Sequence, residues 1–352
     1  MHRRRPLAGA TLALLLALGG LVSAPATAQQ SGGPIEVAVT VPELGSLARE
    51  VGGDEVSVTV FARGTEDAHF VEAKPSFIKA LNQADLYIQM GLEIEIGWAP
   101  VLLRNARNGK VLRGAPGYVD ASTVITPLEV PAGPVDRSMG DVHPQGNPHY
   151  LLDPLNGLRV AQLIRSRLSA LKPEQQGYFT QRYDAFRQRL GKALVGEPLA
   201  QKYDLEQLAI LYQQGRLLSF LKTRGEEKLL GGWLGAMLPY HGTKVVDDHN
   251  LWPYFARAFG ITVLDHLEPL PGISPTTKHL LAIVERMQAE RVRVVLATAY
   301  YDPRHALFVA EKTGAKVVSL AHAVGARAGT DDYLRMIDYN VRQLVAALGA
   351  GG

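Results

Sequence analysis

An alternation of strands and helices begins at Ile35-Glu36-Val37-Ala38-Val39-Thr40-Val41, where β-branched residues alternate as in a β-strand. A short helix is predicted over residues 44–51, and Val56-Ser57-Val58-Thr59-Val60-Phe61 reads as the next strand. The same rhythm continues as far as residue 105. Because strands that alternate with helices form parallel sheets covered by helices on both faces, this half is predicted to be an α/β lobe.

A second alternation of the same kind starts at Lys244 and continues to Leu348. Between the two halves, helical patterns extend over residues 151–171, 174–194 and 204–230. The middle one carries apolar residues at helical spacing, namely Phe179, Tyr183, Phe186 and Leu190. Its length and central position favour a rigid link between lobes, although an ordinary surface helix is the alternative.

The predicted fold class is therefore α/β, with two lobes that each hold a parallel-type sheet flanked by helices. We place the N-terminal lobe at residues 29–172, a long rigid linker helix at 173–195 and the C-terminal lobe at 196–352. The C-terminal lobe includes an extra helical segment near residues 204–230.

The first 28 residues resemble a cleaved signal peptide. Arg3, Arg4 and Arg5 precede an apolar run from Leu7 to Ala24, and Pro25-Ala26-Thr27-Ala28 offers a small-residue cleavage site. An uncleaved membrane anchor is the alternative. Because the chain has no cysteine, we expect a periplasmic protein that is not a lipoprotein.

Charge and cysteine content exclude several classes. Without its first 28 residues the chain carries 34 basic residues, because three of the 37 lie in that segment, against 34 acidic ones. A neutral chain with no basic stripe is not expected to bind nucleic acid. With no cysteine there are no disulfides and no thiolate zinc site.

Histidines stand where several predicted strands end. His69, His249 and His322 each follow a strand, and His149 lies in a turn-prone loop beside Pro148. Ligands of open α/β sheets bind beyond the carboxyl ends of the strands, and neutral imidazole is a common metal ligand. The four imidazoles therefore predict one metal site, with two ligands from each half and a tetrahedral geometry that suits Zn²⁺.

Most of the other histidines are interpreted as ordinary side chains. His241 and His305 fit a surface role, and neither His266 nor His279 is assigned to the metal. His143 stays open: it could capture metal, stack over the site or do neither.

At these residues the chain resembles the cluster A-I, or cluster 9, metal-binding proteins of ABC importers. The resemblance rests on motifs in family order over most of the chain. They are Asp67-Ala68-His69 with Lys74-Pro75-Ser76, Gly91-Leu92-Glu93-Ile94-Glu95-Ile96-Gly97-Trp98, Asn147-Pro148-His149 with Leu152-Asp153-Pro154, His249-Asn250-Leu251-Trp252-Pro253-Tyr254-Phe255, and Asp332-Tyr333 with Met336 and Asn340.

The resemblance implies two α/β lobes joined by one long helix, a metal buried between them, and ligands at His69, His149 and His249. The fourth family ligand is usually a carboxylate in the loop where this chain has His322, so by register His322 replaces it. If His322 points away, water or a carboxylate such as Glu268 or Asp302 completes the site. The long loop rich in histidine and acids that many zinc-binding members carry is absent.

The expected function is to capture a divalent metal and deliver it to an ABC permease. Zn²⁺ is expected over Mn²⁺, because nitrogen-rich sites favour zinc and carboxylates favour manganese. The chain is expected to be a monomer and not an enzyme. A zinc-dependent hydrolase is one alternative, weakened by the lack of an H-E-x-x-H grouping; an exported metal buffer or adhesin on the same fold is another.

Overall fold

The structure is a computed structural model that describes residues 2, 33–134, 142–270 and 272–349. Residues from Pro34 onward form one compact unit. The predicted signal peptide lies outside the described residues, apart from His2. Within the described parts, no helix is both long enough and apolar enough to cross a bilayer.

Two parallel sheets of four strands confirm the predicted fold class. In the first, the order is β2-β1-β3-β4; in the second it is β6-β5-β7-β8. The strands are β1 (Ile35–Val39), β2 (Val56–Val60), β3 (Leu86–Gln89), β4 (Tyr118–Asp120), β5 (Lys244–Asp247), β6 (Thr262–His266), β7 (Val294–Ala297) and β8 (Lys316–Ser319). In each sheet the strand order reverses between two neighbouring strands, β1 and β3 in the first sheet and β5 and β7 in the second. This reversal leaves a crevice at the carboxyl ends of the strands.

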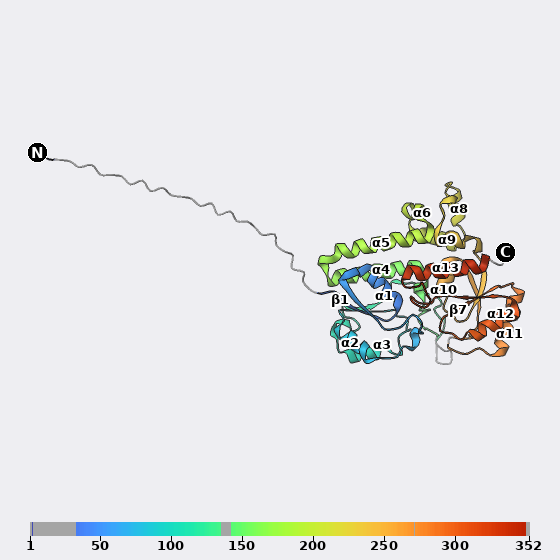
Figure 1. Ribbon diagram of the computed structural model, residues 1–352, viewed down its shortest axis with the longest axis horizontal. Coiled ribbons are helices and arrows are strands. Elements are labelled where there is room, and N and C mark those ends of the chain that lie inside the picture. The colour runs from blue at the N-terminus through green and yellow to red at the C-terminus, as the bar shows by residue number, and fades with distance from the viewer. Residues whose placement is uncertain (1, 3–32, 135–141, 271, 350–352) are drawn as a thin grey trace. The chain divides into compact units, whose positions relative to one another are not determined.

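Helices cover the sheets on both faces (Figure 1). In the first half α2 (Pro75–Gln83) and α3 (Ala99–Ala106) lie together on the face opposite α1 (Pro42–Gly52). The second half contains α10 (Pro253–Phe259), α11 (Thr277–Ala289), α12 (Pro303–Thr313) and α13 (Tyr333–Gly349). Apolar side chains of both halves join in one continuous core, and smaller clusters lie under α2 and α3 and under α11 and α12.

Two long helices lie over both halves. The helix α4 (Pro154–Leu171) packs along α5 (Gln176–Val195), and α5 also contacts α1 of the first half and α13 of the second (Figure 1). Asp153 caps α4 by accepting a hydrogen bond from the backbone N–H of Leu155 at 2.9 Å. The buried residues Phe179, Phe186 and Leu190 show that α5 is held by packing along its length. The lobe boundaries themselves remain a prediction.

The helical pattern over residues 204–230 is not one helix. The segment that follows α5 is broken into α6 (Glu197–Lys202), α7 (Leu205–Gln213) and α8 (Leu217–Lys222), before α9 (Gly232–Met237). Gly215 and Gly225, each at φ +67°, provide left-handed backbone at the breaks. The strand β4 was not predicted, because three residues are too few to show a strand period.

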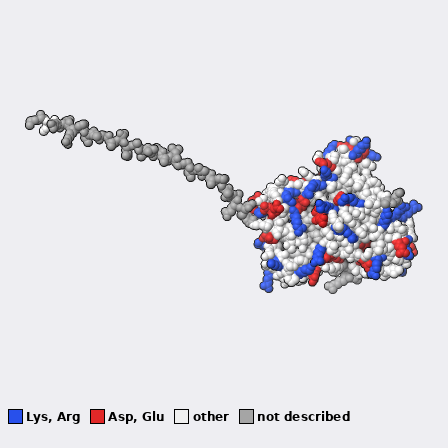
Figure 2. Space-filling view, viewed as in Figure 1, with Lys and Arg blue, Asp and Glu red and all other residues white. Residues whose placement is uncertain are grey.

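Charged residues on the face seen in Figure 2 are mixed, with basic and acidic side chains side by side. No stripe of one sign runs across this face.

Replacing Gly157 in α4 with alanine is expected to destabilise the protein by roughly 1–3 kcal/mol, the usual cost of overpacking. A Cβ there would lie 2.2 Å from the hydroxyl of Tyr333. That ring cannot move aside freely, because its hydroxyl donates to the carbonyl of Leu151 at 2.7 Å. Gly177→Ala is the control, since a Cβ at Gly177 meets nothing within 4 Å. This substitution is expected to stabilise the protein by up to about 1 kcal/mol. Urea unfolding measures the stability of both variants. Equal changes in stability would contradict the close packing of Gly157 against Tyr333.

Candidate metal centre

Local turns hold the two histidines of the first half. The Asp67 carboxylate accepts from the backbone N–H of His69 at 2.9 Å, and the Asn147 side chain accepts from the N–H of His149 at 3.0 Å. Each polar side chain thus bonds the backbone two residues on, which forms a tight turn. This explains physically why Asp or Asn precedes each histidine by two positions.

The structure brings three of the predicted ligands together across the two halves. The ring centres of His69 and His149 lie 5.7 Å apart, and those of His149 and His249 lie 6.1 Å apart. Two imidazoles on one tetrahedral zinc ion have ring centres about 5 Å apart, given Zn–N bonds of about 2.0–2.1 Å. The three rings are therefore close to the spacing that a shared ion needs.

Carboxylates orient two of these rings. Asp67 lies 2.6 Å from Nδ1 of His69, and Glu268 lies 2.8 Å from Nδ1 of His249. With Nδ1–H donated to a carboxylate, Nε2 of each ring carries the lone pair that a metal would need. Tyr301 adds a further support, because it stacks on His249 with ring centres 5.2 Å apart.

His143 joins the cluster, although the sequence left its role open. Its Nε2 lies 2.9 Å from Nε2 of His69, and the two rings stack. In contrast, His322 packs edge-on against Tyr300, and its Nε2 lies 3.3 Å from the carbonyl oxygen of Glu66. The structure thus places His143, not His322, in ring contact with His69, and the fourth ligand stays a prediction.

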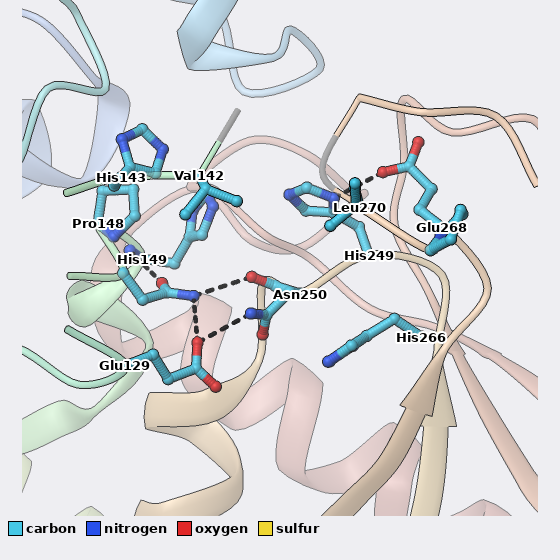
Figure 3. A pocket seen from close by; sticks show the side chains of 12 residues that line it. Glu129, Val142, His143, Pro148, His149, His249, Asn250, His266, Glu268 and Leu270 are labelled. Atoms are coloured by element: carbon cyan, nitrogen blue, oxygen red, sulfur yellow. Dashed lines mark hydrogen bonds and ion pairs between the residues drawn. The ribbon is translucent and has the colours of Figure 1, made fainter. Parts of the chain in front are cut away.

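A cavity of about 210 Å³ opens beside the cluster (Figure 3). A hydrogen-bonded group at its wall joins the halves: Asn147 donates to Glu129 at 3.1 Å and to the carbonyl of Asn250 at 2.9 Å. Asn250 in turn donates to Glu129 at 2.9 Å. This bridge fixes the loops that carry His149 and His249.

The sequence does not reveal the roles of two further residues of this cavity wall. His266 lines the cavity but binds Asp247, with Nδ1 at 2.5 Å from the carboxylate. Glu268 was considered only as a possible ligand, whereas it lies on the outer nitrogen of His249. The other carboxylate considered, Asp302, is exposed and pairs with Arg304. No periodicity in the sequence could reveal these pairings, which depend on the approach of separate loops.

The environment favours the neutral form of three imidazoles, those of His143, His149 and His322. Burial, and then the neighbouring His69 and His249, lowers the pKa of His149 well below its ordinary value. Burial also lowers the pKa of His143 to about 3 and that of His322 to about 4. Neutral rings keep the lone pairs that a cation requires. Within the described ranges, however, no three histidine or acidic side chains already stand in a metal-binding arrangement.

The comparisons with known proteins agree with this fold. The family model of ZnuA, the periplasmic component A of a zinc-uptake complex, matches residues 37–194 and 234–347. SloC of Streptococcus mutans, a metal ABC transporter substrate-binding lipoprotein, is 22% identical over 89% of this chain and 90% of its own length. PsaA of Streptococcus pneumoniae, a manganese ABC transporter substrate-binding lipoprotein, is 21% identical over 96% of this chain and 97% of its own.

Solved structures share the fold. A crystal structure of ZnuA superposes with a TM-score of 0.65 at 21% identity, covering 89% of this chain and 99% of that one. The Mn-bound periplasmic metal-binding protein of Candidatus Liberibacter asiaticus superposes with a TM-score of 0.60 at 17% identity, covering 89% and 98%.

The fold has two lobes, and the histidine cluster takes its rings from both of them. The chain belongs to the ZnuA family, which comprises substrate-binding proteins of metal ABC importers. Proteins of this family work with an ABC permease. The broken helical segment that follows α5 lies largely in the gap of the family match, between residues 194 and 234.

The prediction of a periplasmic protein that is not a lipoprotein is wrong by this comparison. SloC, PsaA and FimA of Streptococcus parasanguinis are all lipoproteins by name. The prediction depended on the absence of one residue type, which was too narrow a basis to exclude a lipid anchor.

Asp67→Asn is expected to weaken metal binding by about 10–100-fold, the usual loss when the partner of a ligating histidine is removed. Asparagine keeps the turn, because its side-chain oxygen still accepts from the His69 N–H, but it no longer offers a carboxylate to Nδ1. Competition with a zinc-sensitive dye measures the loss. Asp54→Asn, at an exposed position of the same half, is the control, and equal affinities of the two variants would contradict this role.

In the metal-free protein the rings of His143 and His322 are expected to stay neutral at pH 5, where an ordinary histidine with a pKa near 6.5 is protonated. Each therefore contributes stability above about pH 6.5 that is lost as the pH falls toward its lowered pKa, because the unfolded chain takes up protons first. Ring-proton NMR shifts report the charge in the folded and in the urea-unfolded protein. Protonation of both rings near pH 6.5 in the folded protein would contradict the burial.

Proposed function

We propose that this chain captures Zn²⁺ between its lobes through His69, His149, His249 and His322 and delivers the ion to an ABC permease. The observation that supports it best is the approach of three imidazoles from both halves, at ring spacings of 5.7 and 6.1 Å. Each half contributes a ring whose Nδ1 lies on a carboxylate.

Zinc is favoured over manganese because the converging donors are mainly nitrogen. Imidazole suits zinc, while Mn²⁺ prefers carboxylate and carbonyl oxygens. Asp67 and Glu268, the nearest carboxylates, lie on the outer nitrogens of His69 and His249. The PsaA relatives are manganese proteins by name, so metal choice is the property that needs measurement.

In this role the chain acts as a monomer and catalyses no reaction, because capture and delivery of an ion need only a binding site. Calorimetric titration of the metal-stripped protein with Zn²⁺ and with Mn²⁺ tests the proposal. We expect one tight zinc site per chain and much weaker binding of manganese. His322→Ala should weaken zinc binding. Tighter binding of manganese than of zinc would overturn the metal assignment, and no binding of either ion would overturn the function.

A further inference from the structure

A second, smaller cavity also borders His149. Its volume is about 40 Å³, enough for one ion or a water molecule, since a water needs roughly 10–15 Å³. The walls are mostly apolar, and the polar side chains in them are Glu43, Asp67, His149, Tyr300 and His322. His149 also lines the larger cavity beside the imidazole cluster, so this one side chain borders both spaces.

Two buried polar atoms without a hydrogen-bond partner belong to residues of this one cavity. They are Oε2 of Glu43, on a residue only 7% exposed, and Nδ1 of His322. They come from opposite halves, Glu43 from the first turn of α1 and His322 from the loop after β8. Buried polar atoms are nearly always paired, so two unpaired ones at one cavity require an explanation.

Among the described residues, the Oδ2 of the buried Asp247 also has no partner, but the buried carboxylates of Glu95 and Asp248 have both oxygens paired. Glu95 accepts from the Thr40 hydroxyl and from the backbone N–H groups of Met90 and Gly91. Asp248 accepts from the backbone and hydroxyl of Thr298. Those two carboxylates hold loops at the ends of strands, whereas the free oxygen of Glu43 holds nothing in the protein.

The free atoms of this cavity have the chemistry of a cation site. His322 lies with Nε2 toward the carbonyl of Glu66, so Nε2 carries the proton and Nδ1 presents a lone pair. A carboxylate oxygen and an imidazole nitrogen are both ligands of divalent zinc. The ion would also neutralise a carboxylate that the apolar walls otherwise leave without a counter-charge.

We propose that the cavity bounded by Glu43, His149 and His322 is an inner station for the divalent cation, with Glu43 as a ligand. This inference rests on the proposed function. An ion that enters at His69 and His249 passes to the inner station through His149, which faces both spaces. It also gives His322 a role consistent with its distance from the other rings.

Zinc titration of Glu43→Gln, paired with zinc X-ray absorption, tests the proposal. Glutamine keeps the volume but removes the charge, so zinc affinity is expected to fall at least about tenfold and one oxygen ligand to disappear from the absorption spectrum. Glu72→Gln is the matched control, because Glu72 is exposed and lies three residues from His69; it should behave as the unaltered protein.

Circular dichroism of metal-free Glu43→Gln checks that the variant folds, and Glu43→Asp provides a second variant with the charge kept and the oxygen withdrawn. An unchanged zinc affinity and an unchanged ligand shell in Glu43→Gln would show that Glu43 binds only a water, and the inner station would be discarded. His69→Ala separates the two ideas. If His69→Ala weakens zinc binding while Glu43→Gln does not, only the inner station fails; if neither matters, the proposed function fails too.

Discussion

Replacing His69 with alanine is expected to weaken zinc binding at least about 100-fold, more than the loss of the carboxylate behind it. His69 is the central ring of the cluster, in contact with both His143 and His149. Its removal takes away a donor and also the support of its neighbours. Asp67 in the same turn lies at Nδ1 of His69, on the side of the ring away from Nε2.

The measurement is a competition titration of metal-stripped protein against a chelator of known zinc affinity. His305→Ala is the control, since His305 lies on α12 and outside both cavities of the site. His305→Ala should titrate as the unaltered protein. Superimposable curves for His69→Ala and the unaltered protein would remove the imidazole cluster as the binding site.

Gly64→Ala is expected to disturb the contact between the two loops that carry His69 and His322. A Cβ on Gly64 would lie 2.2 Å from the carbonyl oxygen of Val324 and 2.8 Å from the backbone nitrogen of Ala326. Both are backbone atoms, so no side-chain rotation relieves the clash. The loops must separate, at an expected cost of roughly 1–3 kcal/mol.

Because this contact joins the two halves beside the site, the cost should appear in metal affinity as well as in stability. Every 1.4 kcal/mol corresponds to about tenfold in affinity. Gly97→Ala is the matched control, because a Cβ there meets only the His69 carbonyl oxygen at 3.8 Å. Thermal unfolding with and without zinc compares the stability of the two variants, and zinc titration compares their affinity. An affinity unchanged in Gly64→Ala would mean that the loops move apart without affecting the site.

The sheets were predictable from sequence because their signal is local. Alternating β-branched residues identified β1 and β2, and Lys244-Val245-Val246 identified β5. The strand Tyr118–Asp120 was not predicted, because three residues are too few to show the alternation of a strand. It is a strand because it pairs with β3. The break at Gly215 was missed because one glycine within a helical pattern does not determine which backbone region it adopts.

The candidate site was only partly predictable. Loop positions and turn residues indicated His69, His149 and His249, because a polar residue two positions earlier or a strand end can be read along the chain. The direction of a ring cannot be read in this way. His322 packs against Tyr300 from the loop after β7, and Glu43 reaches the small cavity from the first turn of α1. Both placements arise from contacts between distant segments.

The continuous apolar core has a consequence for how an ion can leave. Buried side chains of both halves form one cluster beneath α4 and α5, so swinging the halves apart would bring that interior into water. Each 100 Å² of apolar surface exposed costs about 2.5 kcal/mol. Unloading is therefore cheapest when the rim of the site deforms, at the short segments around His69, His249 and Gly325, while the scaffold beneath stays closed.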